Sequence, residues 1–214
     1  MSTNRKFLAL AIFASQIGLI AGVPPASAQD WYPLFEGAAW HYRSDGYQVT
    51  VSVQAPEERL GLTVWPVLYE VVPVAGTPFE SVYYTYIDGS GDVVRIGGSF
   101  HPDSGFWEFL PSWLFLKLPP SVGTSWDMGY DDQVWHPAGD KTAQSWLVEE
   151  DIVTPAGSFH VYSCGYASVA EGVGVVRQRL ASVMSPEMVE LVSYNLPVRN
   201  DTGSWGGIKA LFLR

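Results

Sequence analysis

The sequence predicts an all-β fold: a single domain that forms a strongly curved antiparallel meander, as a half-barrel or open barrel, after a cleaved signal peptide. Segment after segment alternates apolar and polar residues with a period of two and is rich in β-branched and aromatic side chains. Turns that contain Gly, Pro and Asp separate these segments, and helical periodicity does not extend beyond about two turns. Roughly a dozen short strands joined in this way are typical of curved or barrel-like sheets.

The amino-terminal end has the pattern of a secretory signal peptide. Two basic residues precede a mostly apolar run at residues 7–23, and the small-residue pattern Ala-Ser-Ala follows at 26–28. Polar residues interrupt the run, so no transmembrane anchor is expected. No cysteine stands directly after the run, where a bacterial lipid anchor would be attached, which argues against lipid attachment. We therefore expect residues 1–28 to be removed and residues 29–214 to form one all-β domain in the periplasm or outside the cell.

The individual segments support the strand prediction in chain order. In residues 47–53 three valines alternate with polar residues, and residues 60–72 form one long β-rich run bent at Pro66, which suits an edge or a bulge. Residues 153–180 (VTPAGSFHVYSCGYASVAEGVGVVRQRL) begin with a Pro-Gly turn and continue as strand, glycine turn and second strand. Further strands are expected at residues 124–128, 144–153, 188–195 and 208–213.

The clearest predicted hairpin spans residues 81–96 and turns at Asp-Gly-Ser-Gly-Asp. The Gly-Ser-Gly centre supplies the positive-φ positions that a tight reversal needs. Asp88 and Asp92 are either turn residues or calcium ligands. The segment lacks the further carboxylates and the terminal Glu of an EF-hand loop, so turn chemistry is the preferred interpretation and no metal is predicted.

Composition and motif content argue against most familiar activities. The chain has 22 acidic and 12 basic residues and a net charge of −10, which disfavours binding to nucleic acids and anionic membranes. The four histidines are scattered, and one cysteine cannot supply a structural zinc site. Glu149, Glu150 and Asp151 are consecutive and indicate a solvated strand edge or turn. We predict no catalytic residue, no metal and no cofactor; a hydrolase with two facing carboxylates is the enzymatic alternative.

Cys164 is the only cysteine, so no internal disulfide is possible. The preferred interpretation is a small buried side chain within a strand. An intermolecular disulfide or a reactive thiol is the alternative. His160 lies on the same expected strand, too far along it to form a catalytic Cys-His pair.

Aromatic residues supply the candidate ligand site. The nine Trp either fill the core, which is the preferred interpretation, or present rings that stack on sugars. Residues 106–118 (FWEFLPSWLFLKL) are the most apolar stretch after the signal peptide and either lie in the core or line the mouth of a cavity. The ligand-lining candidates are Trp107, Trp113, Phe115 and, in an irregular loop at 129–141 where exposure is most expected, Trp135.

Four segments, in order along the chain, resemble motifs of a family of exported bacterial β-sheet domains of unknown function. The opening YPLFEGAAWHY resembles PL-x-x-G-x-x-W-x-Y, and LPPSVGTSW resembles a later Pro-Gly-Trp segment. VTPAGSFHVYSC and EGVGVVRQ resemble the V-x-x-P-A-G-x-F and GVGlV hairpin, and residues 188–194 resemble a closing strand. The resemblance implies strongly curved antiparallel sheets, similar to the half-barrels of periplasmic lipoprotein carriers, and carries no catalytic residues over. Ala170 and Glu171 depart from the family's usual lead into the GVG turn.

The expected function is that of an exported, non-enzymatic β domain that binds an apolar ligand or a partner protein in a concave sheet. One alternative is a carbohydrate- or surface-binding module that uses exposed aromatic rings. Another is a structural envelope protein with no ligand. The expected partners are accordingly a lipid, a glycan or an envelope protein, and not a nucleic acid.

Overall fold

The computed structural model describes residues 27–100, 105–128, 143–180 and 187–197. These residues form one short helix and fourteen strands, so the predicted all-β class is confirmed. The elements are α1 (Ala28–Trp31), β1 (Ala39–Arg43), β2 (Tyr47–Val53), β3 (Glu57–Arg59), β4 (Leu62–Pro73), β5 (Phe79–Ile87), β6 (Val93–Phe100), β7 (Trp107–Leu116), β8 (Ser125–Asp127), β9 (Ala143–Ser145), β10 (Val148–Thr154), β11 (Gly157–Ser163), β12 (Ala167–Ala170), β13 (Gly174–Leu180) and β14 (Glu187–Asn195).

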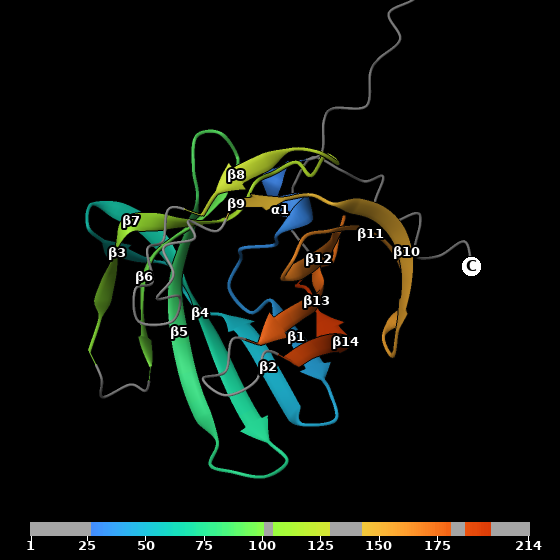
Figure 1. Cartoon of the computed structure of the whole chain (residues 1–214). Helices are drawn as coiled ribbons and strands as arrows, with labels where there is room; N and C mark the ends of the chain where they lie inside the picture. The colour runs from blue at the N-terminus through green and yellow to red at the C-terminus, as the bar shows by residue number, and fades with distance from the viewer. Residues whose placement is uncertain (1–26, 101–104, 129–142, 181–186, 198–214) are drawn as a thin grey trace, which may run out of the picture.

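Twelve of the strands form one open, curved antiparallel sheet (Figure 1). The order is β10-β11-β12-β13-β14-β1-β2-β4-β5-β6-β7, and β3 pairs with β4 outside this path. Most neighbours in sequence are thus neighbours in the sheet, as a meander predicts. The sheet does not begin at β1 and end at β14, however. The first and last strands, β1 and β14, pair in the middle, and β7 and β10 form the two edges.

The small β8–β9 sheet lies between these two edges (Figure 1). The N–H of Leu114 in β7 donates to the carbonyl of Met128, just after β8, at 2.9 Å. The N–H of Leu147, just after β9, donates to the carbonyl of Ser163 in β11 at 2.9 Å. Trp146 between them is fully buried in the main core. The two-stranded sheet therefore covers the side that the main sheet leaves open.

Alternation along the strands makes the inner face of the sheet apolar. The valines of β2 (Val49, Val51 and Val53) are buried as predicted, and the polar residues between them are partly exposed. In β14, Val189 and Leu191 are fully buried in the same way. Because every second side chain of each strand points inward, the curved sheet encloses one large hydrophobic core.

The tryptophans of the described residues belong to this core or its margin. None of the seven is exposed: Trp31, Trp40, Trp126 and Trp146 are buried, and Trp65, Trp107 and Trp113 are partly buried. This supports the core interpretation for these seven side chains. Trp135 and Trp205 lie outside the described residues.

The predicted Gly-Ser-Gly hairpin is present as β5 and β6. The carboxylate of Asp88 holds the turn, because it accepts hydrogen bonds from the N–H groups of Ser90 (2.7 Å) and Asp92 (3.0 Å). The carboxylate of Asp92 is buried and accepts from Lys117 Nζ (2.8 Å) and from the N–H of Leu118 (2.9 Å). Both aspartates therefore have structural partners, in agreement with the turn interpretation.

The strand predicted at residues 60–72 was wrong at its start. Leu60 (φ 52°) and Gly61 (φ 77°) both have left-handed backbones and form the tight turn between β3 and β4. This conformation is rare for leucine, and the apolar pattern could not indicate it. Pro66 lies in β4 where the partner on one side changes from β3 to β2, a gap in that ladder that tolerates a residue without an N–H. The predicted edge or bulge was wrong, because β4 is an inner strand and its ladders show no register shift there.

Two other strand boundaries also differ from the prediction. The stretch at 144–153 is divided, because β9 ends at Ser145 and β10 begins at Val148. Residues 153–180 contain a further short strand, β12, between β11 and β13. The Pro-Gly turn is confirmed, with Thr154 opposite Gly157. The loop predicted at 129–141, the strand predicted at 208–213 and all but the end of the predicted signal peptide fall outside the described residues.

Candidate functional site

Four aromatic rings surround the guanidinium group of Arg95 in the interior. The Cζ atom of Arg95 lies 3.7 Å from the ring centre of Phe115, 4.4 Å from Tyr83, 4.8 Å from Trp113 and 5.6 Å from Tyr69. Arg95 is only 3% exposed. A cation within about 6 Å of an aromatic ring face is attracted by the π electrons. We call these five residues the Arg95 cage.

Strand register brings the members of the Arg95 cage together. Arg95 in β6 pairs with Trp113 in β7, and Phe115 lies two positions further along β7, so both rings point to the same side of the sheet. Tyr69 in β4 and Tyr83 in β5 come from the next two strands, with ring centres 5.5 Å apart. The cage is therefore built from four adjacent strands of one sheet.

The Arg95 cage holds a positive charge that forms no ion pair with a carboxylate of the described residues. Arg95 Nη2 donates a hydrogen bond to the Tyr69 hydroxyl at 2.8 Å. Among the described residues Arg95 forms no ion pair, and its Nε has no hydrogen-bond partner. Transfer of an ion from water to the interior is strongly unfavourable unless an opposite charge or hydrogen bonds compensate. The aromatic faces and the phenol oxygens of Tyr69 and Tyr32 provide that compensation only in part.

Burial keeps the nearby phenol groups in their neutral form. Desolvation raises the pKa of Tyr32 above its ordinary value, and the charge of Arg95 opposes this only in part. Burial likewise raises the pKa of Tyr42. Both hydroxyl groups are therefore protonated at neutral pH. Neither supplies a negative charge to Arg95, but each has an O–H that can donate a hydrogen bond.

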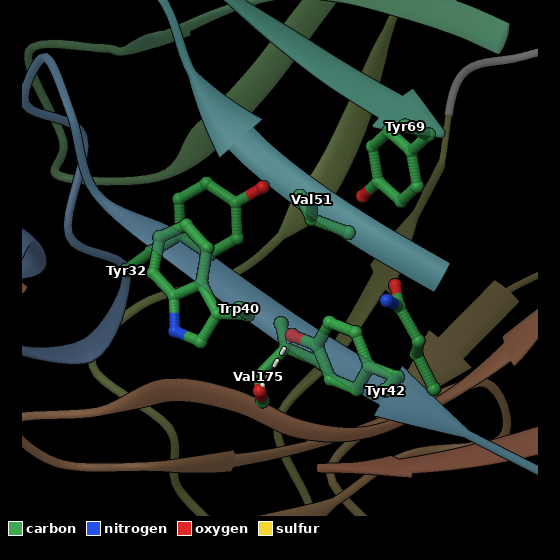
Figure 2. Close-up of a pocket in the computed structure, with 7 residues that line it drawn as sticks. Tyr32, Trp40, Tyr42, Val51, Tyr69 and Val175 are labelled. Atoms are coloured by element: carbon green, nitrogen blue, oxygen red, sulfur yellow. Dashed lines mark hydrogen bonds between the residues drawn. The ribbon is translucent and has the colours of Figure 1, made fainter. Parts of the chain in front are cut away.

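A cavity of about 10 Å³ adjoins the Arg95 cage through Tyr69. Figure 2 shows the hydroxyl groups of Tyr32 and Tyr69 turned toward each other on either side of Val51. The Tyr42 hydroxyl donates to the carbonyl of Val175 at 2.8 Å. A space of this size holds about one water molecule. The complete lining is Tyr32, Trp40, Tyr42, Val51, Tyr69, Val175 and Gln178.

The structure brings together two of the four predicted ligand-lining residues. Trp113 and Phe115 both lie on Arg95. Trp107 is partly buried at the start of β7 and contacts Phe109, whose ring centre lies 6.3 Å from that of Trp107 and 5.9 Å from that of Trp113. Trp135 lies outside the described residues.

Three members of the Arg95 cage were not predicted as site residues from the sequence: Arg95, Tyr69 and Tyr83. One signal for Arg95 was present: it is the only charged residue within the apolar run VVRI that follows the Gly-Ser-Gly turn. Period two places it on the same side as Val93, which is fully buried. Tyr69 and Tyr83 carried no comparable signal, because tyrosine is common on both faces of strands.

The strand that carries half of the Arg95 cage lies at an edge of the sheet. β7 pairs with β6 on one side, and this ladder is irregular, with register shifts between Val93 and Val94 and between Arg95 and Gly97. On the other side, the backbone bond from Leu114 to Met128 joins β7 to the small sheet. An edge strand with an interrupted ladder opens more easily than a central strand.

A second group of titratable side chains lies on the outer face of the edge hairpin β10–β11. His160 Nδ1 is 2.8 Å from Asp151 Oδ1, and His160 Nε2 is 2.8 Å from Glu149 Oε1. Hydrogen bonds to Asp151 and Glu149 raise the pKa of His160. The intervening Glu150 points to the opposite face and accepts from Ser163 Oγ at 3.0 Å. The solvated strand edge predicted here is confirmed.

Within the ranges that the structure describes, no three or more His, Cys, Asp or Glu side chains are placed to hold a metal ion. No helix in these ranges is long and apolar enough to cross a membrane.

Comparison with known proteins adds no relative: no family model, no curated protein and no solved structure matches this chain. Membership in the family of exported β-sheet domains is therefore still a prediction from four short segments. Function has to be argued from the Arg95 cage itself.

Proposed function

We propose that this chain is an exported, non-enzymatic β domain that binds a small apolar ligand on the inner face of its curved sheet, in the periplasm or outside the cell. The observation that carries the proposal is the Arg95 cage, where aromatic rings from four strands converge on one polar group. Small-molecule sites commonly combine a mostly apolar and aromatic lining with a few convergent polar groups.

Edge strand β7 gives a ligand a route to this interior. It contributes Trp113 and Phe115 to the cage, and Phe109 packs beside them. Its ladder with β6 is interrupted twice, so outward movement of β7 breaks fewer backbone hydrogen bonds than movement of an inner strand. The cavity of about 10 Å³ is too small for an organic ligand. Binding therefore requires displacement of the Trp113 and Phe115 rings.

The same filled interior favours a second candidate function, a structural envelope protein with no small ligand. The two candidates differ in one respect that can be measured, the presence of a bound molecule. Glycan binding has less support, because none of the seven described tryptophans is exposed. Binding of a partner protein in place of a small ligand is also compatible with a filled interior.

Native mass spectrometry of the protein recovered after export tests the proposal. We expect an additional bound mass, which an organic extract of the same sample identifies, and saturable binding of the neutral fluorescent probe phenylnaphthylamine. A bare polypeptide mass together with no saturable binding would remove the ligand proposal and leave the structural candidate.

A matched pair of substitutions places the binding. Phe115→Ala removes a cage ring, whereas Phe106→Ala removes a partly exposed ring that meets Tyr84 edge to face, with ring centres 5.3 Å apart. We expect Phe115→Ala to change the probe affinity and Phe106→Ala to leave it within about twofold, since only the former ring faces the interior. Equal effects of both substitutions would place the probe elsewhere.

A further inference from the structure

We infer that the ligand is an anionic amphiphile, with one carboxylate or sulfonate-like head group bound by Arg95 and an apolar body packed among the rings of β7. This inference rests on the proposed function and adds the chemical class of the ligand. The observation that carries it is the pairing of a fully enclosed guanidinium with an absence of acidic partners among the described residues.

Comparison with the ion pairs of the described residues shows that a buried cation without a carboxylate partner is unusual in this protein. Arg59 pairs with Glu57, Lys117 with Asp92, and Arg177 with Glu190, although each of these basic side chains is between 29% and 38% exposed. These cations are partly hydrated and need a carboxylate less than a buried cation does. Arg43 and Arg179 also lack an ion pair among the described residues, but both are exposed to water, whereas Arg95 is only 3% exposed. Selection for stability alone would place a carboxylate beside the buried cation before it placed one beside the partly exposed cations.

The geometry of the guanidinium suits an anion with two or more oxygens. Arginine has five N–H donors in a planar fork, and one of them is used by the Tyr69 hydroxyl. Its Nε–H has no partner in the described part of the chain. A carboxylate or sulfonate can accept two parallel hydrogen bonds from such a fork.

Neutral hydroxyl groups beside Arg95 can complete the head-group site. Tyr69 links the Arg95 cage to the small cavity, and Tyr32 faces Tyr69 across that cavity (Figure 2). Protonated phenols donate hydrogen bonds to an anion and add no repulsive charge. Tyr42 is committed to the carbonyl of Val175 at 2.8 Å. Tyr32 and Tyr69 interact with each other and with Arg95, so they are the phenols that lie beside a head group on the guanidinium.

We expect the rest of the ligand to be apolar, because the β7 side chains that extend from Arg95 are aromatic. The rings of Phe109, Trp113 and Phe115 form a chain along β7, with successive centres 5.9 Å and 5.4 Å apart. The net charge of −10 repels anions at a distance. Anion binding thus depends on the local field of Arg95 and not on general attraction to the surface.

Two fluorescent probes with the same ring system test the inference: anilinonaphthalene sulfonate, which carries one negative charge, and phenylnaphthylamine, which is neutral. We expect the wild-type protein to bind the sulfonate at least about tenfold more tightly, as a charge-assisted bidentate contact provides. Arg95→Met should abolish this preference, and Arg95→Lys should keep part of it. The matched control Arg177→Met removes an outer cation and should leave the preference unchanged.

The possible results separate the inference from the proposed function. If both probes bind the wild-type protein equally, a ligand site exists but the anionic class is wrong. If neither binds saturably, the proposed function itself fails. Retention of the preference in Arg95→Met, or its loss in Arg177→Met, would place anion binding outside the Arg95 cage. Near-ultraviolet circular dichroism of each variant verifies that its aromatic core is folded.

Discussion

At the scale of single residues, the interior combines groups that a stable core normally keeps apart. The guanidinium of Arg95 lies among four aromatic rings and donates to the Tyr69 hydroxyl, but no carboxylate of the described residues reaches it. Cation–π contacts contribute about 2 kcal/mol when desolvated. Desolvation of an unpaired ion opposes folding by more than that. The residue thus suits binding better than stability.

We expect the substitution Arg95→Met not to destabilise the protein. Because methionine fills a similar volume and carries no charge, we expect the free energy of unfolding to stay the same or to rise by up to about 2 kcal/mol. Urea denaturation monitored by circular dichroism measures it. A loss of more than about 2 kcal/mol would mean that the cage needs the cation for stability, and the functional interpretation of Arg95 would lose its main support.

A second prediction at this scale concerns the single thiol. Cys164 is free and buried, and burial raises its pKa above the ordinary value. Since the thiolate is the reactive form, we expect the native protein to react with a disulfide reagent at pH 7 roughly tenfold or more slowly than the urea-unfolded chain. Rapid native labelling, or a disulfide-linked dimer on a non-reducing gel, would support the alternative of a reactive or bridging cysteine.

At the scale of elements, the two edges of the sheet are protected in different ways. Edge strand β10 carries Glu149, Glu150 and Asp151, and charges on an edge oppose pairing with a second chain. Edge strand β7 is largely apolar and is joined to the small sheet by the bond from Leu114 to Met128. The acidic run therefore has a structural explanation, whereas the apolar edge coincides with the Arg95 cage.

The β10–β11 hairpin predicts a measurable pH dependence. Hydrogen bonds to Asp151 and Glu149 raise the pKa of His160 above its ordinary 6.5. The stabilising effect of the charged ring is therefore present below pH 6.5 and is lost as pH rises through the higher folded-state value. Because the three side chains are exposed, the effect on global stability is small.

Titration of the His160 ring protons by NMR tests this prediction. We expect a midpoint above 6.5 in the wild-type protein and a lower midpoint in Asp151→Asn. Glu80→Gln, which removes an exposed carboxylate from β5 instead, should leave the midpoint unchanged. A wild-type midpoint at or below the ordinary value would show that the two carboxylates do not hold the ring in solution.

At the scale of the whole molecule, the first and last strands of the described residues, β1 and β14, pair in the centre of the sheet. β1 pairs with β14 on one side and with β2 on the other, so β1 and β14 join the early strands to the late ones. Neither half of the sheet can complete its central ladder without the other. Unfolding should therefore be a single cooperative transition over both halves.

Substitution in β14 tests this cooperativity. Leu191 is fully buried and pairs with Tyr42 of β1, so Leu191→Ala should lower the free energy of unfolding by about 2 to 5 kcal/mol. The neighbouring Val192 is 37% exposed, and Val192→Ala should change it by no more than about 0.5 kcal/mol. Far- and near-ultraviolet circular dichroism should report one shared midpoint, and two separate midpoints would contradict the single-transition view.

The fold class follows from local sequence patterns alone, because period-two alternation and turn residues can be recognised without knowing which strands pair. Most strands, the Gly-Ser-Gly hairpin and the Pro-Gly turn could be predicted in this way. Trp113 and Phe115 could be selected as site candidates because they belong to the most apolar stretch. The left-handed turn at Leu60 could not be predicted from the sequence, since the backbone conformation of a turn residue depends on the strands that it connects.

The neighbours of each strand and the side chains around Arg95 can be seen only in the folded structure. The pairing of β1 with β14 joins residues far apart in sequence, and no local pattern encodes it. Tyr69 and Tyr83 reach Arg95 because three successive ladders place β4, β5, β6 and β7 in register. A buried cation is recognisable only when its surroundings are known, because the absence of a carboxylate is a property of space and not of sequence.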